Sequence, residues 1–311
     1  MKSQPKVSVI LPIFDVEEYL HQCVDSVINQ TLEEMEIILA TDGPETCDKI
    51  CEEYAQKDSR IKILSHPGNY GLAINKGLEI AQGEYIGIVE TDDFIEPDMF
   101  KNLYGKASQT QADIVKSAYK EYYDSTKETP EKTILRMDGI EPPENGFKIT
   151  EYPQIFLRHP SIWSAIYRKD FLVKNNIKFI EKRASWIDNN FQIETLCLAQ
   201  KIVWDTNAYY NYRMTNPKAS SHLKDFNIPF DRSNEIHEFL KPYGQKFAPI
   251  LPYLHKREIG YISKVIDSGF DQKSPEVKAK IDKMLERISE HEVLENDCFR
   301  QQERDLYFSL K

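Results

Sequence analysis

The stretch VSVILPIFDVEEYLHQCVDSVINQT (7–31) joins a short apolar run to an amphipathic pattern, and it decides the fold class. Residues 7–14 are apolar on successive positions, as in a parallel strand covered on both faces. Leu20, Cys23 and Val27 then recur at intervals of three and four residues, which predicts a helix. Further apolar runs, with helical patterns between them, lie at 36–41, 61–64 and 84–90. This alternation predicts an α/β fold with a doubly wound, mostly parallel sheet and right-handed crossovers.

Length and charge exclude several classes of protein. The 311 residues carry 40 Lys+Arg against 50 Asp+Glu, a net charge of −10, and are long enough to bury a substantial core. The negative charge argues against binding to nucleic acid or to an anionic membrane through a basic face. The five cysteines form no CxxC pair, which is typical of reduced thiols. We therefore expect a cytoplasmic protein that acts in the cytosol or at the inner face of the membrane.

The chain changes character along its length. We expect one domain at 1–225, with a nucleotide-binding half at 1–110 and an acceptor or catalytic half at 111–225, followed by a helical region at 226–311. Residues 120–150 are charged and rich in proline, which predicts a surface excursion or lid.

The helical region carries an apolar face with charges on its other faces. Its positions are Val277, Ile281, Leu285, Ile288 and Val293. This face predicts a homodimer or a peripheral membrane contact, with packing on the sheet domain as the alternative.

Three carboxylates follow the fourth apolar run, in Glu90-Thr91-Asp92-Asp93. Doubly wound sheets bind ligands beyond the carboxyl ends of their strands. In an extended turn Glu90 and Asp92 project to the same side, so they can share one Mg²⁺ or Mn²⁺ ion that bridges to a diphosphate. A solvated acidic turn before the next helix is the alternative.

Polar residues also follow the second and third apolar runs. Asp42 can accept a hydrogen bond from a ribose or a base edge, although an Asp before Gly-Pro is also a turn former. Asn69 leads into a helix that carries Asn75 and Gly77, where small residues allow close approach of a ligand; helix capping by Asn69 is the alternative. The sequence has no GxGxxG after its first run and no GxxxxGK[ST], which disfavours dehydrogenases and P-loop NTPases.

Taken in order, these segments resemble glycosyltransferase family 2, with its GT-A nucleotide-sugar fold. The matching blocks are 7–31, EIILATDGP (36–44) and NYGLAINKGLEIAQGEYIGIVETDDFIEPDMF (69–100). A weaker similarity continues through SIWSAIYRKDFL (161–172), SWIDNNF (185–191) and YYNYRMTNPKASSH (209–222).

The resemblance implies a site for a nucleotide-diphosphate sugar and a divalent metal, Mn²⁺ or Mg²⁺. Asp92 is expected to be the main metal ligand, with Glu90 bound directly or through water and His222 completing the set. Asp93 is expected to contact the sugar or the acceptor. The other expected donor-binding residues are Pro12, Phe14 and Asp42 at the base, Glu17 at the ribose, and Asn69 and Asn75.

The resemblance also implies that Asp188 is the catalytic base, which takes the proton of the acceptor hydroxyl in a single inverting displacement. A helix cap is the alternative for this residue. Trp163 and Tyr167 are expected to form a wall for a sugar ring or to belong to the core. Arg213, together with Lys218, is expected to contact the diphosphate.

Four positions depart from the pattern of the family: Thr41 and Glu90 each replace an Asp, Asp15 stands where Asn is common, and Ile187 stands where Glu is usual. The expected activity is metal-dependent transfer of a hexosyl or hexosaminyl group from a UDP-sugar to a glycan or lipid-linked glycan of capsule, lipopolysaccharide or another surface polysaccharide. The alternatives are an inactive nucleotide-sugar-binding scaffold and a nucleotidyltransferase. A nucleotidyltransferase would need a Gly-rich basic loop after the first strand, where PIFDVEEY is acidic.

Overall fold

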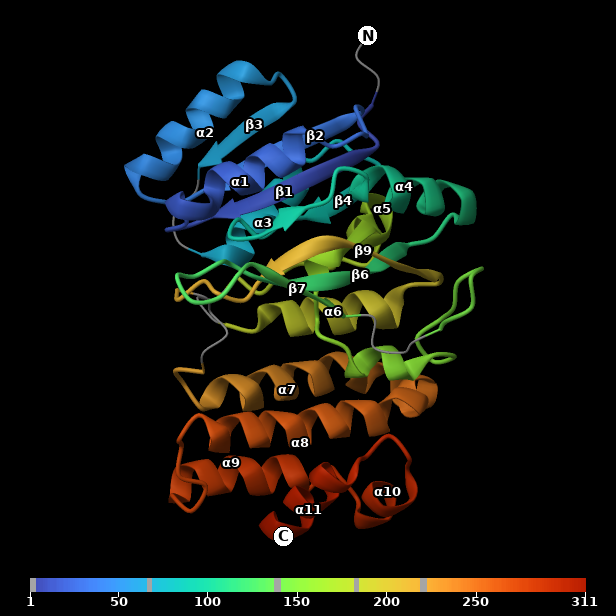
Figure 1. Ribbon diagram of the computed structural model, residues 1–311. Helices are drawn as coiled ribbons and strands as arrows, with labels where there is room; N and C mark the ends of the chain where they lie inside the picture. The colour runs from blue at the N-terminus through green and yellow to red at the C-terminus, as the bar shows by residue number, and fades with distance from the viewer. Residues whose placement is uncertain (1–3, 66–68, 137–140, 182–184, 219–222) are drawn as a thin grey trace. The chain divides into compact units, whose positions relative to one another are not determined.

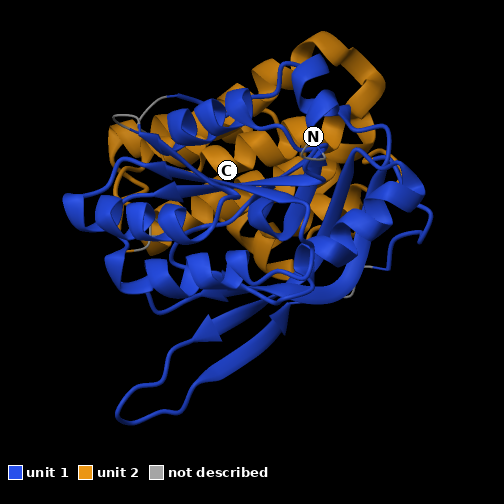
Figure 2. Cartoon of the chain, turned by 90° about the horizontal axis from the view of Figure 1, so that it is seen from above, with its two compact units in different colours: residues 1–148, 161–183, 198–217 blue, residues 149–160, 184–197, 218–311 orange. Residues whose placement is uncertain are grey.

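The computed structural model describes residues 4–65, 69–136, 141–181, 185–218 and 223–311. The chain divides into two compact units, shown in different colours in Figure 2. Unit 1 comprises residues 1–148, 161–183 and 198–217, and unit 2 comprises residues 149–160, 184–197 and 218–311. This division differs from the expected boundary at 225, because two segments from the middle of the chain belong with the C-terminal helices.

Unit 1 is built on a nine-stranded sheet in the order β3-β2-β1-β4-β8-β6-β9-β5, with β7 paired to β6 (Figure 1). The strands are β1 (Val7–Ile13), β2 (Met35–Thr41), β3 (Ile61–Ser65), β4 (Tyr85–Ile88), β5 (Phe94–Ile95), β6 (Ile114–Tyr123), β7 (Lys132–Arg136), β8 (Ala165–Arg168) and β9 (Ile202–Arg213).

The first four strands form the parallel half that the sequence predicts. β1 pairs in parallel with β2 and β4, and β2 pairs in parallel with β3. Every residue of β1 and β2 is buried, as expected of strands covered on both faces. The carboxyl ends of β1, β2 and β4 therefore meet at one edge of the sheet.

The remaining strands make a mixed sheet. β8 is antiparallel to β4 and β6, whereas β6 and β9 are parallel. Part of the expected excursion at 120–150 is regular structure, because β6 runs on to Tyr123 and pairs with β7 in an antiparallel hairpin. Lys132, Thr133 and Leu135 of β7 are exposed, so the strand has no apolar run that would reveal it in the sequence.

The helices of unit 1 pack on both halves of the sheet, because some contact β1, β2 and β3 and others contact β6, β8 and β9. They are α1 (Glu17–Ile28), α2 (Glu45–Lys57), α3 (Tyr70–Ile80), α4 (Met99–Thr110), α5 (Lys169–Lys174) and the 3-10 turn η2 (Ile162–Ser164). A Cβ atom added at Gly77 of α3 would lie 2.8 Å from Cγ2 of Ile10 in β1. Gly77 therefore serves close packing of a helix on a strand, and not the approach of a ligand.

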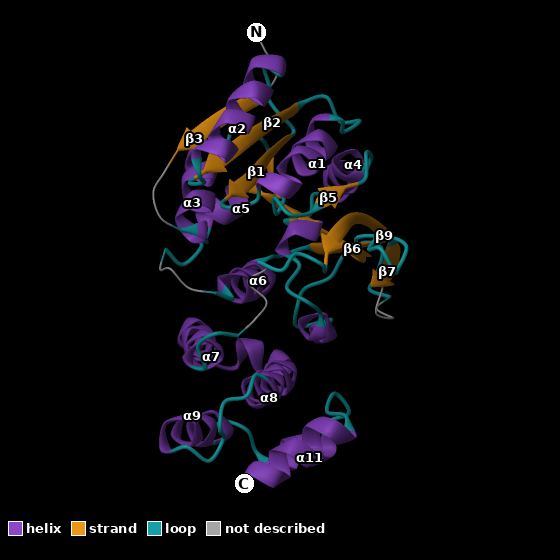
Figure 3. Cartoon of the chain, turned by 60° about the vertical axis from the view of Figure 1, so that its left-hand side comes forward, coloured by secondary structure: helices purple, strands orange, loops and turns teal. Residues whose placement is uncertain are grey.

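Unit 2 is helical, with α7, α8 and α9 side by side (Figures 1 and 3). Its elements are η1 (Pro153–Leu157), α6 (Ile187–Leu198), α7 (Asn227–Leu240), η3 (Lys241–Ile250), α8 (Leu251–Asp267), α9 (Pro275–Leu285), α10 (Glu290–Glu295) and α11 (Gln301–Leu310). None of the described helices in the chain is both long and apolar enough to span a bilayer.

The apolar face of the C-terminal helices is covered within unit 2. Val277, Ile281, Leu285, Ile288 and Val293 are all at most 4% exposed and belong to one core cluster with Phe230, Ile259 and Ile262. The face from which a homodimer or a membrane contact was predicted is therefore not exposed, because helices of the same unit cover it. The pattern showed that the face is apolar, but not that neighbouring helices of the same unit cover it.

Candidate active site

The acidic turn Glu90–Asp93 lies at the carboxyl end of β4 and is held against the end of β1. The Thr91 hydroxyl donates to the Pro12 carbonyl at 2.8 Å, and the Val89 N–H donates to the Ile10 carbonyl at 3.1 Å. The structure thus brings Pro12 next to the turn, at the edge where parallel sheets bind ligands.

Asp92 is partly buried, and two residues of a distant segment hold it. Asn216 Nδ2 donates to Asp92 Oδ2 at 2.8 Å, and Arg213 Nε donates to the Asp92 carbonyl at 2.7 Å. Asn216 was not singled out in the sequence, although it lies in the block 209–222 that resembles the family. These two contacts fix both the backbone and the side chain of the expected metal ligand.

Asp93 is only 1% exposed and accepts two hydrogen bonds from the protein. Its Oδ2 accepts from the Tyr210 hydroxyl at 2.8 Å, and its Oδ1 accepts from the Arg213 backbone N–H at 2.7 Å. Burial, together with repulsion from Asp92 and Glu90, raises the pKa of Asp93 well above its ordinary value. Because protein groups engage both oxygens, the geometry favours a positioning role over the expected contact with sugar or acceptor.

Tyr210 connects the two ends of the acidic turn. Besides donating to Asp93, its hydroxyl accepts the Glu90 backbone N–H at 3.0 Å. Trp163 stacks on the Tyr210 ring with the centroids 4.1 Å apart, and Trp163 is itself 5% exposed. Trp163 therefore belongs to the core that supports the turn, as does Tyr167, whose hydroxyl donates to the Ile162 carbonyl at 3.0 Å.

Glu90 is partly buried, and its Oε1 accepts a hydrogen bond from the Tyr70 hydroxyl at the start of α3. Tyr70 is a further contact that the sequence did not single out. The protein thus engages one oxygen of Glu90, as it engages one oxygen of Asp92.

The Arg213 guanidinium is buried among aromatic rings. Its central carbon lies 4.7 Å from the centroid of Tyr19 and 5.1 Å from that of Tyr122. Its terminal nitrogens donate to Asp124 and Gln22. Since these protein groups take the donors, the geometry favours a role in holding the acidic turn over a contact with diphosphate. Lys218, its expected partner, is exposed.

The residues expected at the base and the ribose lie at the ends of β1 and β2, where Ile13 pairs with Thr41. Phe14 is 62% exposed, so its ring is accessible for stacking on a base. Asp42 is partly buried, and its backbone N–H donates to the Ile13 carbonyl at 3.1 Å. Glu17, at the start of α1, accepts from the Thr46 hydroxyl at 2.7 Å.

Asn69 and Asn75 bind a neighbouring loop of the protein. Asn69 Oδ1 caps α3 by accepting the Leu72 N–H at 2.8 Å. Asn75 is buried and pairs with the backbone of Phe179, through Nδ2 at 2.9 Å and Oδ1 at 2.8 Å. These bonds support the capping alternative for Asn69 and a structural role for Asn75.

Asp188 belongs to unit 2, where it is the second residue of α6 and is partly buried. Its Oδ1 accepts from Asn189 Nδ2 at 3.3 Å. Burial raises the pKa of Asp188, and the positive charge of Arg257 partly opposes this shift. A carboxylate with a raised pKa is a better proton acceptor, which suits a general base. His222 lies outside the described residues.

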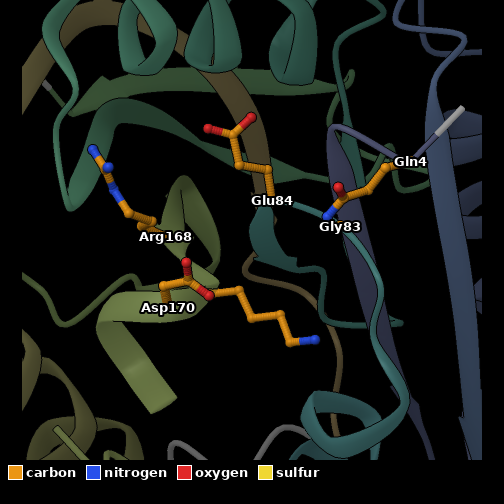
Figure 4. Close-up of a pocket in the computed structure, with 6 residues that line it drawn as sticks. Gln4, Gly83, Glu84, Arg168 and Asp170 are labelled. Carbon is orange, nitrogen blue, oxygen red and sulfur yellow. The ribbon is translucent and has the colours of Figure 1, made fainter. Parts of the chain in front are cut away.

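A small pocket of about 170 Å³ lies elsewhere in unit 1 (Figure 4). Gln4, Gly83, Glu84, Arg168 and Asp170 line it, together with Lys169. Gly83 and Glu84 precede β4, and Arg168 pairs with Tyr85 at the start of that strand. The pocket is therefore at the amino end of β4, whereas the acidic turn follows its carboxyl end.

The chain matches a glycosyltransferase family and is similar to a glycosyltransferase of Bacillus subtilis. A family model described as "Glycosyl transferase family 2" matches residues 8–174. The "Uncharacterized glycosyltransferase EpsJ" of Bacillus subtilis (strain 168) is 32% identical over 248 residues, covering 78% of this chain and 69% of that protein.

Two solved proteins share the fold. S. aureus TarS 1-349 in complex with UDP aligns with a TM-score of 0.74 at 18% identity, over 98% of this chain and 86% of the TarS chain. TarS in complex with UDP-GlcNAc aligns with a TM-score of 0.73 at 19% identity, over 98% and 87% of the two chains. The mannosyltransferase PcManGT of Pyrobaculum calidifontis, in complex with GDP-Man and Mn²⁺, has a TM-score of 0.55 at 11% identity, over 99% and 86%. At these identities the likeness shows the GT-A fold.

Proposed function

Because the chain belongs to glycosyl transferase family 2 and is a glycosyltransferase, we propose that it moves a hexosyl or hexosaminyl group from a UDP-sugar to a glycan acceptor, with inversion at the anomeric carbon. The acidic turn Glu90–Asp93, held at the shared carboxyl edge of β1 and β4, is the observation that carries this proposal. Family membership as a glycosyltransferase removes the nucleotidyltransferase alternative.

The choice of a UDP-sugar rests on the solved neighbours and on the exposed edge of the sheet. TarS, which shares the fold, binds UDP and UDP-GlcNAc. In this chain the exposed ring of Phe14 and the carboxylate of Asp42 flank the ends of β1 and β2, and they are suited to stack on a base and to accept its N–H. We propose that the acceptor is a glycan or a lipid-linked glycan in the synthesis of capsule, lipopolysaccharide or another surface polysaccharide, and that the reaction takes place in the cytoplasm.

A divalent metal ion fits the acidic turn. Carboxylate oxygens are the ligands that Mg²⁺ and Mn²⁺ prefer. Among the described residues Asp92 Oδ2 binds Asn216, whereas Oδ1 has no donor, so this oxygen is available to a cation. We propose Asp92 as a direct ligand through Oδ1 and Glu90 as a ligand through water, because Glu90 is one methylene longer than the Asp usual at its position in the family. When bound, such an ion offsets charge on the diphosphate leaving group.

We assign the proton transfer to Asp188. The acceptor oxygen forms a bond to the anomeric carbon, the bond from that carbon to the diphosphate breaks, and the hydroxyl proton passes to the Asp188 carboxylate. UDP leaves with the electron pair of the broken bond. The raised pKa of Asp188 supports this assignment.

A donor screen tests the proposal. We expect a UDP-sugar to raise the thermal midpoint of the full chain in the presence of Mn²⁺, because binding to the native state stabilises it by mass action. The stabilising donor should then be turned over to UDP when a glycan acceptor is supplied. A chain that binds the donor without any turnover would support the scaffold alternative, and equal stabilisation with chelator present would contradict the metal.

A further inference from the structure

Two histidines and a glutamate of unit 2 form a cluster that the transfer reaction does not use. His237 lies on α7, and His255 and Glu258 lie on α8, one turn apart. One ring nitrogen from each histidine and one carboxylate oxygen lie within 4.8 Å of one another. The imidazole rings are nearly parallel, with an interplanar angle of 20° and centroids 6.1 Å apart.

The carboxylate of this cluster is buried and only half satisfied. Glu258 is 0% exposed. Its Oε1 accepts from the Ser233 hydroxyl and lies 2.8 Å from His237 Nε2. Its Oε2 is buried and has no hydrogen-bond partner among the described residues. A buried carboxylate oxygen without a partner is costly, which calls for a group that would complete it.

A second carboxylate orients one of the histidines. His255 is 5% exposed, and its Nδ1 lies 2.7 Å from Glu292 Oε1 of α10. This arrangement places the ring proton on Nδ1 and leaves the lone pair on Nε2. Histidines that bind metals in proteins commonly donate their other ring N–H to a carboxylate in this way, which fixes the ring and raises its basicity.

We propose that His237, His255 and Glu258 bind one divalent transition-metal ion, with Zn²⁺ as the reference metal. Two imidazole nitrogens and a carboxylate oxygen form a donor set typical of Zn²⁺, and a water molecule completes four-coordination. Mg²⁺ and Ca²⁺ prefer oxygen ligands, so this site selects a different class of metal from the acidic turn of unit 1. The ion joins α7 to α8 and provides the partner that Glu258 Oε2 lacks.

Ion pairs between Glu258 and its neighbouring cations would explain the position of Oε1 but not that of Oε2. Arg287 NH1 lies 3.6 Å from Glu258 Oε1, and a protonated His237 would also face that oxygen. Both cations thus neutralise Oε1, which already has a hydroxyl donor, and neither satisfies Oε2. The terminal nitrogens of Arg287 donate to Ser233 and Asn234, so they are committed to α7.

The test measures zinc binding to the full chain after treatment with chelator and dialysis. We expect one Zn²⁺ per chain, with the same affinity in Asp92→Asn, because the acidic turn is a separate site. His237→Gln should weaken binding at least tenfold, because it removes one of the three protein ligands. His291→Gln is the matched control, since His291 is an exposed histidine of the same unit, and it should bind Zn²⁺ as the wild type does.

A spectroscopic measurement on the wild type keeps the test decisive if His237→Gln does not fold. Substitution with Co²⁺ should give the intense visible absorption of a four-coordinate site, and X-ray absorption at the zinc edge should show nitrogen and oxygen ligands with imidazole scattering. Failure of the wild type to bind Zn²⁺, equal affinity in folded His237→Gln, or a sulfur ligand at the zinc edge would overturn the proposal.

Discussion

Asp93 of unit 1 and Glu258 of unit 2 are both almost completely buried, at 1% and 0% exposed. Their surroundings nevertheless shift the pKa of the two carboxyl groups in opposite directions. Asp93 accepts from a tyrosine hydroxyl and a backbone N–H, both neutral groups, and its pKa is raised well above the ordinary value by burial and by Asp92. Burial alone would also raise the pKa of Glu258, but His237 and His255 outweigh it and lower that pKa.

The difference follows from the charges that surround each carboxylate. The acidic turn gathers Glu90, Asp92 and Asp93 within four residues, so its unbalanced negative charge suits a cation that arrives with a diphosphate. The cluster in unit 2 instead sets one carboxylate beside two imidazoles, with Glu258 0% and His255 5% exposed, and neutral imidazoles offer nitrogen ligands to an ion that stays in place. In our proposals the first arrangement serves a reaction and the second serves the fold of the helices.

The largest expected effect comes from Asp188→Asn, which tests whether unit 2 also contributes to chemistry. This change keeps the size of the side chain but removes its ability to accept the proton. Transfer should fall by about 10²–10⁴-fold, while donor affinity stays near that of the wild type. A helix cap would tolerate the change, because Asn caps about as well as Asp. Transfer within threefold of the wild type would therefore contradict the assignment.

The pH dependence of transfer gives an independent reading of the same residue. A general base works when it is deprotonated, so the rate should rise with pH through the folded pKa of Asp188. Because burial raises that pKa, the acid limb of the kcat/KM profile should lie above the ordinary value of 3.8. An acid limb that persists unchanged in the residual activity of Asp188→Asn would assign the titration to another group.

A smaller effect is expected at the acidic turn, where Asp92→Asn and Glu90→Gln separate direct from water-mediated binding. Asp92→Asn should weaken Mn²⁺-dependent UDP binding at least tenfold, about 1.4 kcal/mol, and Glu90→Gln should weaken it less. Titration calorimetry with UDP and Mn²⁺ measures both. Asp170→Asn, an exposed carboxylate of unit 1, is the control and should bind as the wild type does. A larger loss in Glu90→Gln would reverse the proposed ligand roles.

The smallest effect on the reaction is expected from the neutral donors that hold Asp93, where the change is one of stability. Tyr210→Phe removes the hydroxyl that binds both Asp93 Oδ2 and the Glu90 N–H, so the free energy of unfolding should drop by about 1–3 kcal/mol. Tyr104→Phe is the matched control: its hydroxyl donates to the exposed Glu84 at 2.8 Å, so water can replace that bond. Denaturant unfolding compares them. Equal losses would show that Tyr210 does not hold the turn.

Much of the first hundred residues could be predicted from local patterns. The apolar runs at 7–14, 36–41, 61–64 and 84–90 correspond to β1, β2, β3 and β4, within a few residues at each end. The spacing of apolar residues indicates whether a segment is buried on one face or on both. In the parallel half, runs of successive apolar residues mark strands that are buried on both faces, so these strands could be located from the sequence. The acidic turn could be found for the same reason, since it follows a buried strand directly.

Other expectations failed where a residue could contact either a ligand or another part of the protein. Trp163 has an aromatic ring of the kind that packs against a sugar, but in the structure this ring stacks on Tyr210 in the core. Gly77 resembles a residue that makes room for a ligand, but it makes room for Ile10. The apolar face of α9 is covered by helices of its own unit. In each case the sequence shows that a surface is covered or close-packed, and does not show by what.

The sequence by itself determined the parallel half of the sheet, the acidic residues at its carboxyl edge and the helical character of the C-terminal region, because periodicity and strand-end position are local properties of the chain. Only the tertiary structure decided that Tyr210, Arg213 and Asn216 hold a turn more than a hundred residues earlier, and that His237 meets His255 and Glu258. Such contacts depend on how distant segments pack. No periodic pattern in the sequence links two residues that are far apart in the chain and meet only in the folded protein.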